Sequence, residues 1–122
     1  MQSTDPCPCG TDEPFGTCCL PLHTGARQAD TAEQLMRSRY SAYAVDDVDY
    51  LWRTWHPRTR PTELTPSSGV RWTGLEIVDT ADDEVEFRAH YRRDGHPGTL
   101  HERSRFAVRA RRWFYVDGDL FE

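Results

Sequence analysis

The chain has 122 residues and a formal net charge of −5 at pH 7; 37% of its residues are hydrophobic and 29% are charged. This composition is typical of a single soluble domain, and no apolar run approaches the ~20 residues that cross a bilayer, so we expect no membrane span. The negative net charge also disfavours nucleic acid as a partner, because sequence-independent binding depends on neutralising phosphates.

Residues 1–25 form the first expected unit and contain all four cysteines. They are rich in Cys, Pro, Gly and Thr and show no apolar periodicity, so they need a covalent or metal staple in place of a core. The N-terminus has neither the basic nor the apolar region of a secretory signal peptide. We therefore expect a cytoplasmic protein in a reducing compartment.

The cysteines form two pairs, Cys7-x-Cys9 and Cys18-Cys19, with eight residues between them. Four thiolates fill the tetrahedral shell of one structural Zn²⁺ and leave no open position for catalysis. The alternatives are two disulfides, which a reducing compartment disfavours, and a redox role. His23 could replace one sulfur, but four cysteines already complete the shell.

A helix is predicted at the start of the second expected unit, which spans residues 30–122. Thr31 and Gln34 fit a capping box, and apolar residues then recur at helical spacing. These signals predict a helix over residues 31–45.

A second, short helix is predicted over residues 48–55. It should end at His56, because the residue before a proline is pushed out of the helical region. Residues 57–69 carry three prolines and are predicted to form a loop.

After residue 69 the hydrophobic period changes to two, which predicts strands. We expect a turn at Asp94-Gly95, a loop through Pro97-Gly98 and the end of the last strand at Asp117-Gly118. Helices followed by antiparallel strands define an α+β class. The expected strands are residues 70–79, 84–92, 100–109 and 112–117.

Several segments resemble known families. Cys7-Pro8-Cys9-Gly10 and Cys18-Cys19, with Phe15 between them, resemble the SEC-C motif. That motif binds zinc at the end of the bacterial preprotein translocase motor, where it helps to engage an export chaperone. Five further segments resemble the bacterial YchJ-like family: residues 33–43 (EQLMRSRYSAY), 54–57 (TWHP), 72–75 (WTGL), 101–106 (HERSRF) and 113–118 (WFYVDG).

The resemblance implies a zinc knuckle followed by a cone-shaped domain of the nuclear transport factor 2-like kind. In such a domain, helices pack on a curved antiparallel sheet and cap a pocket. The family brings no established reaction, so no catalytic residue is established by the resemblance.

Polar residues on an apolar strand face would mark the pocket. Glu102 and Ser104 share a face with Leu100, Phe106 and Val108 in this way. A buried carboxylate such as Glu102 needs a partner. The structural alternative is an Arg–Glu pair that only joins helix to sheet. The predicted lining is Arg37, Arg39, Tyr40, Tyr43, Trp55, His56, Glu102 and Ser104.

We favour the hypothesis of a zinc-binding accessory or interaction protein. Its knuckle would dock a protein partner, with the acidic first half favouring a basic surface, and its cone would hold a small ligand. The alternative is an enzyme resembling the isomerases and dehydratases on cone folds, with Glu102 as base and His56 or Tyr43 as proton donor.

The five arginines between Arg103 and Arg112 are expected to form a solvated strand face. The alternative is an anion-binding patch.

Overall fold

The computed structural model describes residues 1–64 and 69–121, so residues 65–68 of the predicted 57–69 loop lie outside the described residues. Helices precede a run of antiparallel strands, which confirms the α+β class. The elements are η1 (Phe15–Thr17), α1 (Leu20–Thr24), α2 (Ala32–Val45), α3 (Val48–Arg53), β1 (Val70–Thr80), β2 (Glu84–Arg93), β3 (His96–Arg109) and β4 (Arg112–Phe121).

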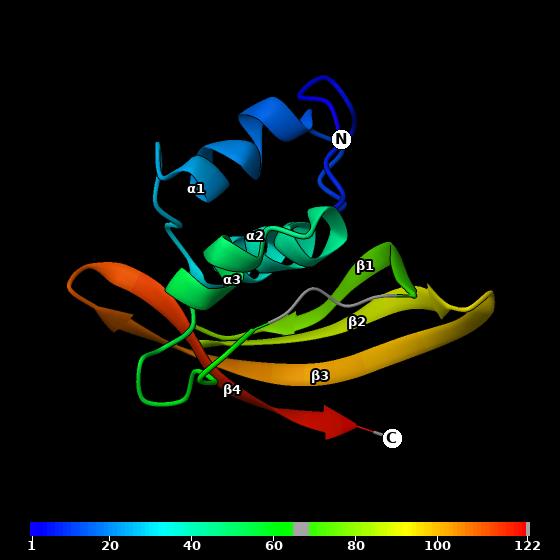
Figure 1. The fold of residues 1–122 in the computed structure, drawn as a ribbon. Coiled ribbons are helices and arrows are strands. Elements are labelled where there is room, and N and C mark those ends of the chain that lie inside the picture. The colour runs from blue at the N-terminus through cyan, green and yellow to red at the C-terminus, as the bar shows by residue number, and fades with distance from the viewer. Residues whose placement is uncertain (65–68, 122) are drawn as a thin grey trace.

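The molecule has three layers (Figure 1). The four strands form one curved antiparallel sheet in the order β1-β2-β3-β4. Helices α2 and α3 lie over one face of the sheet, and the N-terminal segment with η1 and α1 lies on the far side of α2. Among the described helices, none is long and apolar enough to span a membrane.

Helix α2 begins as its capping residues predict. The Thr31 hydroxyl accepts a hydrogen bond from the Gln34 amide at 3.0 Å, and the Gln34 side chain accepts one from the Asp30 amide at 2.6 Å. These contacts satisfy amide groups that have no partner in the first turn of a helix. The central part of α2 is buried, and Leu35 and Ala42 are 2% and 0% exposed.

The third and fourth strands are longer than predicted. Strand β3 begins at His96 and includes Pro97-Gly98, so the predicted loop there is wrong, and β4 continues past Asp117-Gly118 to Phe121. Both glycines give room to a neighbouring side chain. A Cβ on Gly98 would lie 2.5 Å from the Tyr91 ring, and one on Gly118 would lie 2.7 Å from the carboxyl carbon of Glu102.

The two faces of the sheet differ as the alternation in β2 predicts. Val85, Phe87 and Ala89 are at most 6% exposed and pack in the core against α2. On the opposite face, charged side chains pair across the strands. Arg103 binds Glu84 and Asp79 at 2.6 and 2.9 Å, and Arg105 binds Asp117 and Asp119 at 2.6 and 2.8 Å. Because carboxylates already neutralise these two arginines, their pairing favours the solvated face over an anion-binding patch.

Candidate functional site: a cysteine cluster and a cavity on either side of α2

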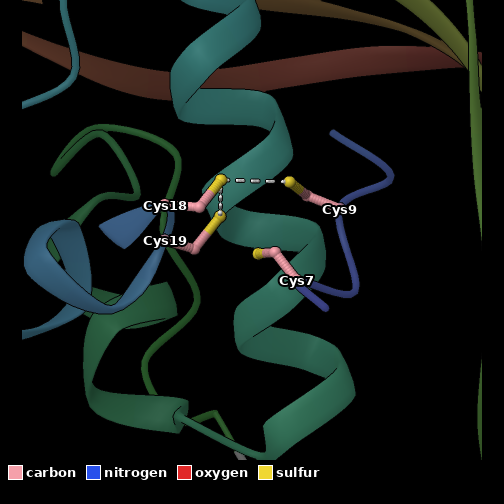
Figure 2. A group of neighbouring side chains, drawn as sticks. All are labelled: Cys7, Cys9, Cys18 and Cys19. Atoms are coloured by element: carbon pink, nitrogen blue, oxygen red, sulfur yellow. Dashed lines mark hydrogen bonds between the residues drawn. The ribbon is translucent and has the colours of Figure 1, made fainter. Parts of the chain in front are cut away.

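The four cysteines converge on one point (Figure 2). Cys7 and Cys9 come from the N-terminal loop, whereas Cys18 and Cys19 lie between η1 and α1. A hydrogen bond from the Cys7 amide to the Glu13 carbonyl, at 2.8 Å, folds the loop back on itself. The four Sγ atoms all lie within 4.8 Å of one another.

The spacing of the sulfur atoms fits a metal shell. Cys9 Sγ lies 3.6 Å from Cys18 Sγ, which lies 3.9 Å from Cys19 Sγ. A tetrahedral Zn²⁺ site with Zn–S bonds of about 2.3 Å places its sulfur atoms about 3.8 Å apart, whereas a disulfide requires about 2.05 Å. None of the four cysteines forms a disulfide. The cluster can therefore hold a metal ion.

The protonation of the cluster points the same way. Hydrogen bonds from Cys19 and Cys7 lower the pKa of Cys9, whereas hydrogen bonds with Cys7 and Cys9, together with burial, raise the pKa of Cys19. Burial raises the pKa of Cys18 to about 11. The surroundings thus stabilise the thiolate of Cys9 and the thiols of Cys18 and Cys19, whereas a divalent cation would stabilise all four thiolates.

The cluster is anchored on α2. Arg37 Nη1 donates to the Cys9 carbonyl at 2.6 Å, and Cys7 Sγ lies 3.5 Å from the Ser41 hydroxyl. His23 is not part of the cluster, because its Nε2 donates to the Ser38 carbonyl at 2.8 Å and its ring packs on Tyr50. The structure thus places His23 where α1 packs against α2 and α3.

A cavity of about 230 Å³ lies on the other side of α2, against the sheet. The structure brings six of the eight predicted pocket residues together there: Arg39, Tyr40, Tyr43, Trp55, Glu102 and Ser104. The predicted lining omits Tyr115 and six apolar residues of the wall, although Leu100 and Phe106 were expected on the same strand face as Glu102. The six are Met36, Trp72, Phe87, Ala89, Leu100 and Phe106. A usable signal existed for Phe87 and Ala89, which follow the same alternation as Val85. The strand register, known only from the structure, then places Phe87 opposite Glu102.

Arg37 and His56 do not line the cavity. Arg37 faces the knuckle, where it also pairs with Glu33 at 2.9 Å. His56 follows Trp55, which forms a bridge with Tyr115, and successive side chains along extended backbone point to opposite sides. The Trp55 ring lines the cavity, and the His56 ring lies outside it against Phe114, with Nδ1 accepting from the Arg58 amide at 3.1 Å.

Arg39 brings a buried cation to the cavity. It is 5% exposed, and its Nη1 donates to the Leu51 carbonyl at 2.8 Å and to the Thr54 hydroxyl at 2.7 Å. The guanidinium lies 5.1 Å from the centre of the Trp55 ring and 4.7 Å from that of Tyr115. Burial lowers the pKa of Arg39, and no ion pair in the described part of the chain involves it.

Glu102 brings a carboxylate to the same cavity. Its Oε2 accepts hydrogen bonds from the hydroxyls of Ser104 and Tyr115, the latter at 3.2 Å. Burial and the nearby charge of Glu102 raise the pKa of Tyr115, so that hydroxyl stays protonated and can donate. The cavity therefore combines an apolar wall with one cation and one hydrogen-bonded carboxylate.

Solved structures with the same fold come from two bacteria. One is the solution structure of a SEC-C motif containing protein from Rhodopseudomonas palustris, with a TM-score of 0.85 and 32% identity, covering 97% of this chain and 100% of that one. The other is the crystal structure of a SEC-C motif containing protein from Psychrobacter arcticus, with a TM-score of 0.79 and 28% identity, covering 98% of this chain and 85% of that one.

Sequence comparisons identify the family. The profile of the YchJ middle NTF2-like domain matches residues 31–118, and that of the SEC-C motif matches residues 4–21. A UPF0225 protein of Streptomyces coelicolor is 52% identical over 98% of both chains, and one of Deinococcus radiodurans is 53% identical over 92% of this chain and 87% of that one. The chain therefore belongs to the UPF0225 family and joins a SEC-C motif to a YchJ-type NTF2-like domain.

Proposed function

We propose that this protein is a zinc-binding interaction protein, in which Cys7, Cys9, Cys18 and Cys19 hold one structural Zn²⁺ per chain. The observation that carries the zinc assignment is the convergence of the four Sγ atoms within 4.8 Å of one another. Zinc prefers tetrahedral thiolate shells, and a shell closed by four sulfurs has no position for a substrate. The ion therefore supplies structure rather than chemistry.

The cysteines would order a surface for a protein partner. They tie the first 25 residues to α2, on the side away from the cavity, and leave Asp12 and Glu13 exposed at the tip of the loop. Exposed carboxylates steer a basic surface toward this loop. We propose that the partner is a protein with a basic docking surface and that binding occurs in the cytoplasm.

Metal analysis of the purified protein tests the zinc assignment. We expect about one Zn per chain, as four thiolate ligands imply, and a loss of that zinc in the Cys18→Ser/Cys19→Ser variant. His23→Gln is the matched control and keeps its zinc, because His23 lies outside the cluster. A metal-free wild type with two disulfides by mass would overturn the assignment.

Capture experiments with charge-neutral variants test the docking surface. Asp12→Asn/Glu13→Gln removes two charges, and asparagine tolerates the positive φ of 67° at position 12. We expect this variant to keep its zinc and lose proteins that the wild type captures from the source cell. The control Asp82→Asn/Asp83→Asn removes two exposed charges before β2 and should capture the wild-type set. Equal capture by all three proteins would count against docking at this loop.

The geometry gives less support to an isomerase-like or dehydratase-like enzyme. Glu102 does line the cavity, but His56 lies outside it, so the predicted acid–base pair loses its histidine. Tyr43 is the remaining proton donor of that pair in the cavity wall.

A further inference from the structure

We propose that the cavity between α2 and the sheet binds a small, single-ring carboxylate that also carries a hydrogen-bond donor. Arg39 would pair with the carboxylate, and Glu102 would accept the donor. The inference concerns the cavity and not the cysteines, so its failure would leave the zinc proposal intact.

The surroundings of Arg39 favour the binding of an anion. A buried cation without a carboxylate loses its hydration and gains no ion pair in return. Its Nε and Nη2 make no hydrogen bond to any residue that the structure describes, whereas Nη1 is held by Leu51 and Thr54. The Trp55 and Tyr115 rings pack against the guanidinium. A planar guanidinium with free donors matches the two oxygens of a carboxylate.

Glu102 would bind the hydrogen-bond donor of the ligand. Its Oε2 is occupied by Ser104 and Tyr115, and its Oε1 makes no hydrogen bond within the described ranges 1–64 and 69–121. An ionised carboxylate only accepts hydrogen bonds, so a ligand must offer it a hydroxyl or amine. With one cation and one anion, the cavity favours a ligand that has an anionic group and a donor over a simple anion.

The size and wall of the cavity favour one ring. Its volume of about 230 Å³ exceeds the ~150 Å³ that accommodates benzene in an engineered cavity and falls short of the ~300–1,000 Å³ of drug-sized sites. Tyr40, Trp72, Phe87 and Phe106 supply aromatic surface to the wall. Edge and face contacts with these rings stabilise a bound aromatic ring.

Titration calorimetry on the full-length, zinc-loaded protein tests the proposal with three probes of similar shape. We expect 4-hydroxybenzoate to bind, and benzoate and 4-hydroxybenzamide to bind at least about ten-fold more weakly, because each lacks one charge-assisted hydrogen bond. Amide chemical shifts should change at cavity residues. No binding of 4-hydroxybenzoate at millimolar concentration, or equal binding of the neutral amide, would overturn the proposal.

Two substitutions assign the roles of the side chains. Arg39→Lys keeps the charge but loses the planar fork, so 4-hydroxybenzoate should bind about ten-fold more weakly. Glu102→Gln keeps the shape, and the preference for 4-hydroxybenzoate over benzoate should shrink. Arg105→Met, on the outer face of the sheet, is the control and should bind like the wild type.

Zinc content and melting temperature, measured for each variant, separate a loss of binding from a loss of folding. Unchanged affinity in a folded Arg39→Lys variant would show that the planar guanidinium does not hold the carboxylate, and would overturn that assignment. If that variant does not fold, the three-probe comparison on the wild type decides alone.

Discussion

The sequence does not show which side of a helix a given residue faces, and Arg37 and Arg39 illustrate this. Both lie on α2 and both are arginines that could pair with Glu102. Two residues along an α-helix correspond to a rotation of about 200°, so only one of them can face the sheet. The sequence does not show which one, because the knuckle and the sheet cover opposite sides of α2. Arg37 binds the knuckle at Cys9, and Arg39 lines the cavity.

Gly118→Ala should destabilise the fold by about 1 kcal/mol, the usual net contribution of one hydrogen bond, because the Glu102 side chain must shift to make room for the new methyl group. The new Cβ would overlap the carboxylate of Glu102 and displace it from Ser104. Gly74→Ala is the matched control, because its Cβ would lie 3.9 Å from the His90 ring, an ordinary contact distance, and its cost should stay within about 0.5 kcal/mol. Chemical denaturation measures both variants. Equal stability of the two would contradict the close approach at Gly118.

His23 should make the fold sensitive to acid. Burial lowers the pKa of His23, so the folded state binds its proton less readily than the unfolded state, where the pKa is about 6.5. The contribution of neutral His23 is complete above that value and is lost as the pH falls below it.

Denaturation of the wild type and His23→Gln at pH 7.5 and 5.5 checks this dependence. The free energy of unfolding should fall more in the wild type than in the variant, with the zinc content of both measured at each pH. Parallel losses would show that His23 does not contribute.

At the scale of helices and strands, a boundary was predictable where a side chain caps the end of the element. The capping residues Thr31 and Gln34 placed the start of α2 to within one residue. The ends of β3 and β4 were missed because Gly98 and Gly118 were interpreted as turn residues. Each glycine lies beside a bulky side chain of a neighbouring strand, and that neighbour cannot be known before the strand register is known.

Thr31→Ala should cost about 1 kcal/mol of stability, the typical value for loss of a helix N-cap. The alanine leaves the Gln34 amide without the acceptor that it has at 3.0 Å in the wild type. Thr31→Ser keeps an oxygen at the same place and should be nearly neutral. Thermal unfolding followed by circular dichroism measures both, and a neutral Thr31→Ala would contradict the cap.

At the scale of the whole molecule, the sequence predicted the class of fold and the clustering of the cysteines, because local spacing carries both. The alternating residues of β2 likewise predicted the buried face. The cavity was only partly predictable, since its wall combines α2, Trp55 and all four strands. Side chains that meet only after the chain has folded leave little signal in local periodicity.

Chelation should loosen one layer of the molecule and leave the others folded. Residues 1–25 depend on the cysteines, whereas α2 and the sheet share an apolar core that includes Leu35, Val85 and Phe106. Treatment with a zinc chelator should therefore expose amides of residues 1–25 to hydrogen exchange and lower the melting temperature. Protection in β2 and β3 should persist at 25 °C. Unchanged exchange in residues 1–25 after complete metal removal would show that the knuckle is ordered without the ion.

The position of α2 between two layers has a consequence for mutational tolerance. The structure describes α2 in full, and eight of its 14 residues are buried. An ordinary surface helix accepts many substitutions on its solvent side, so its tolerance rises and falls with a period of 3.6 residues. In α2 that side is narrow: the Glu33 side chain is 40% exposed, whereas the N-terminal segment covers Ser41, and the cavity and sheet cover Met36 and Tyr40. A systematic substitution scan of residues 32–45 should therefore find tolerance confined to a narrow stripe that includes Glu33, and low tolerance over most of the helix.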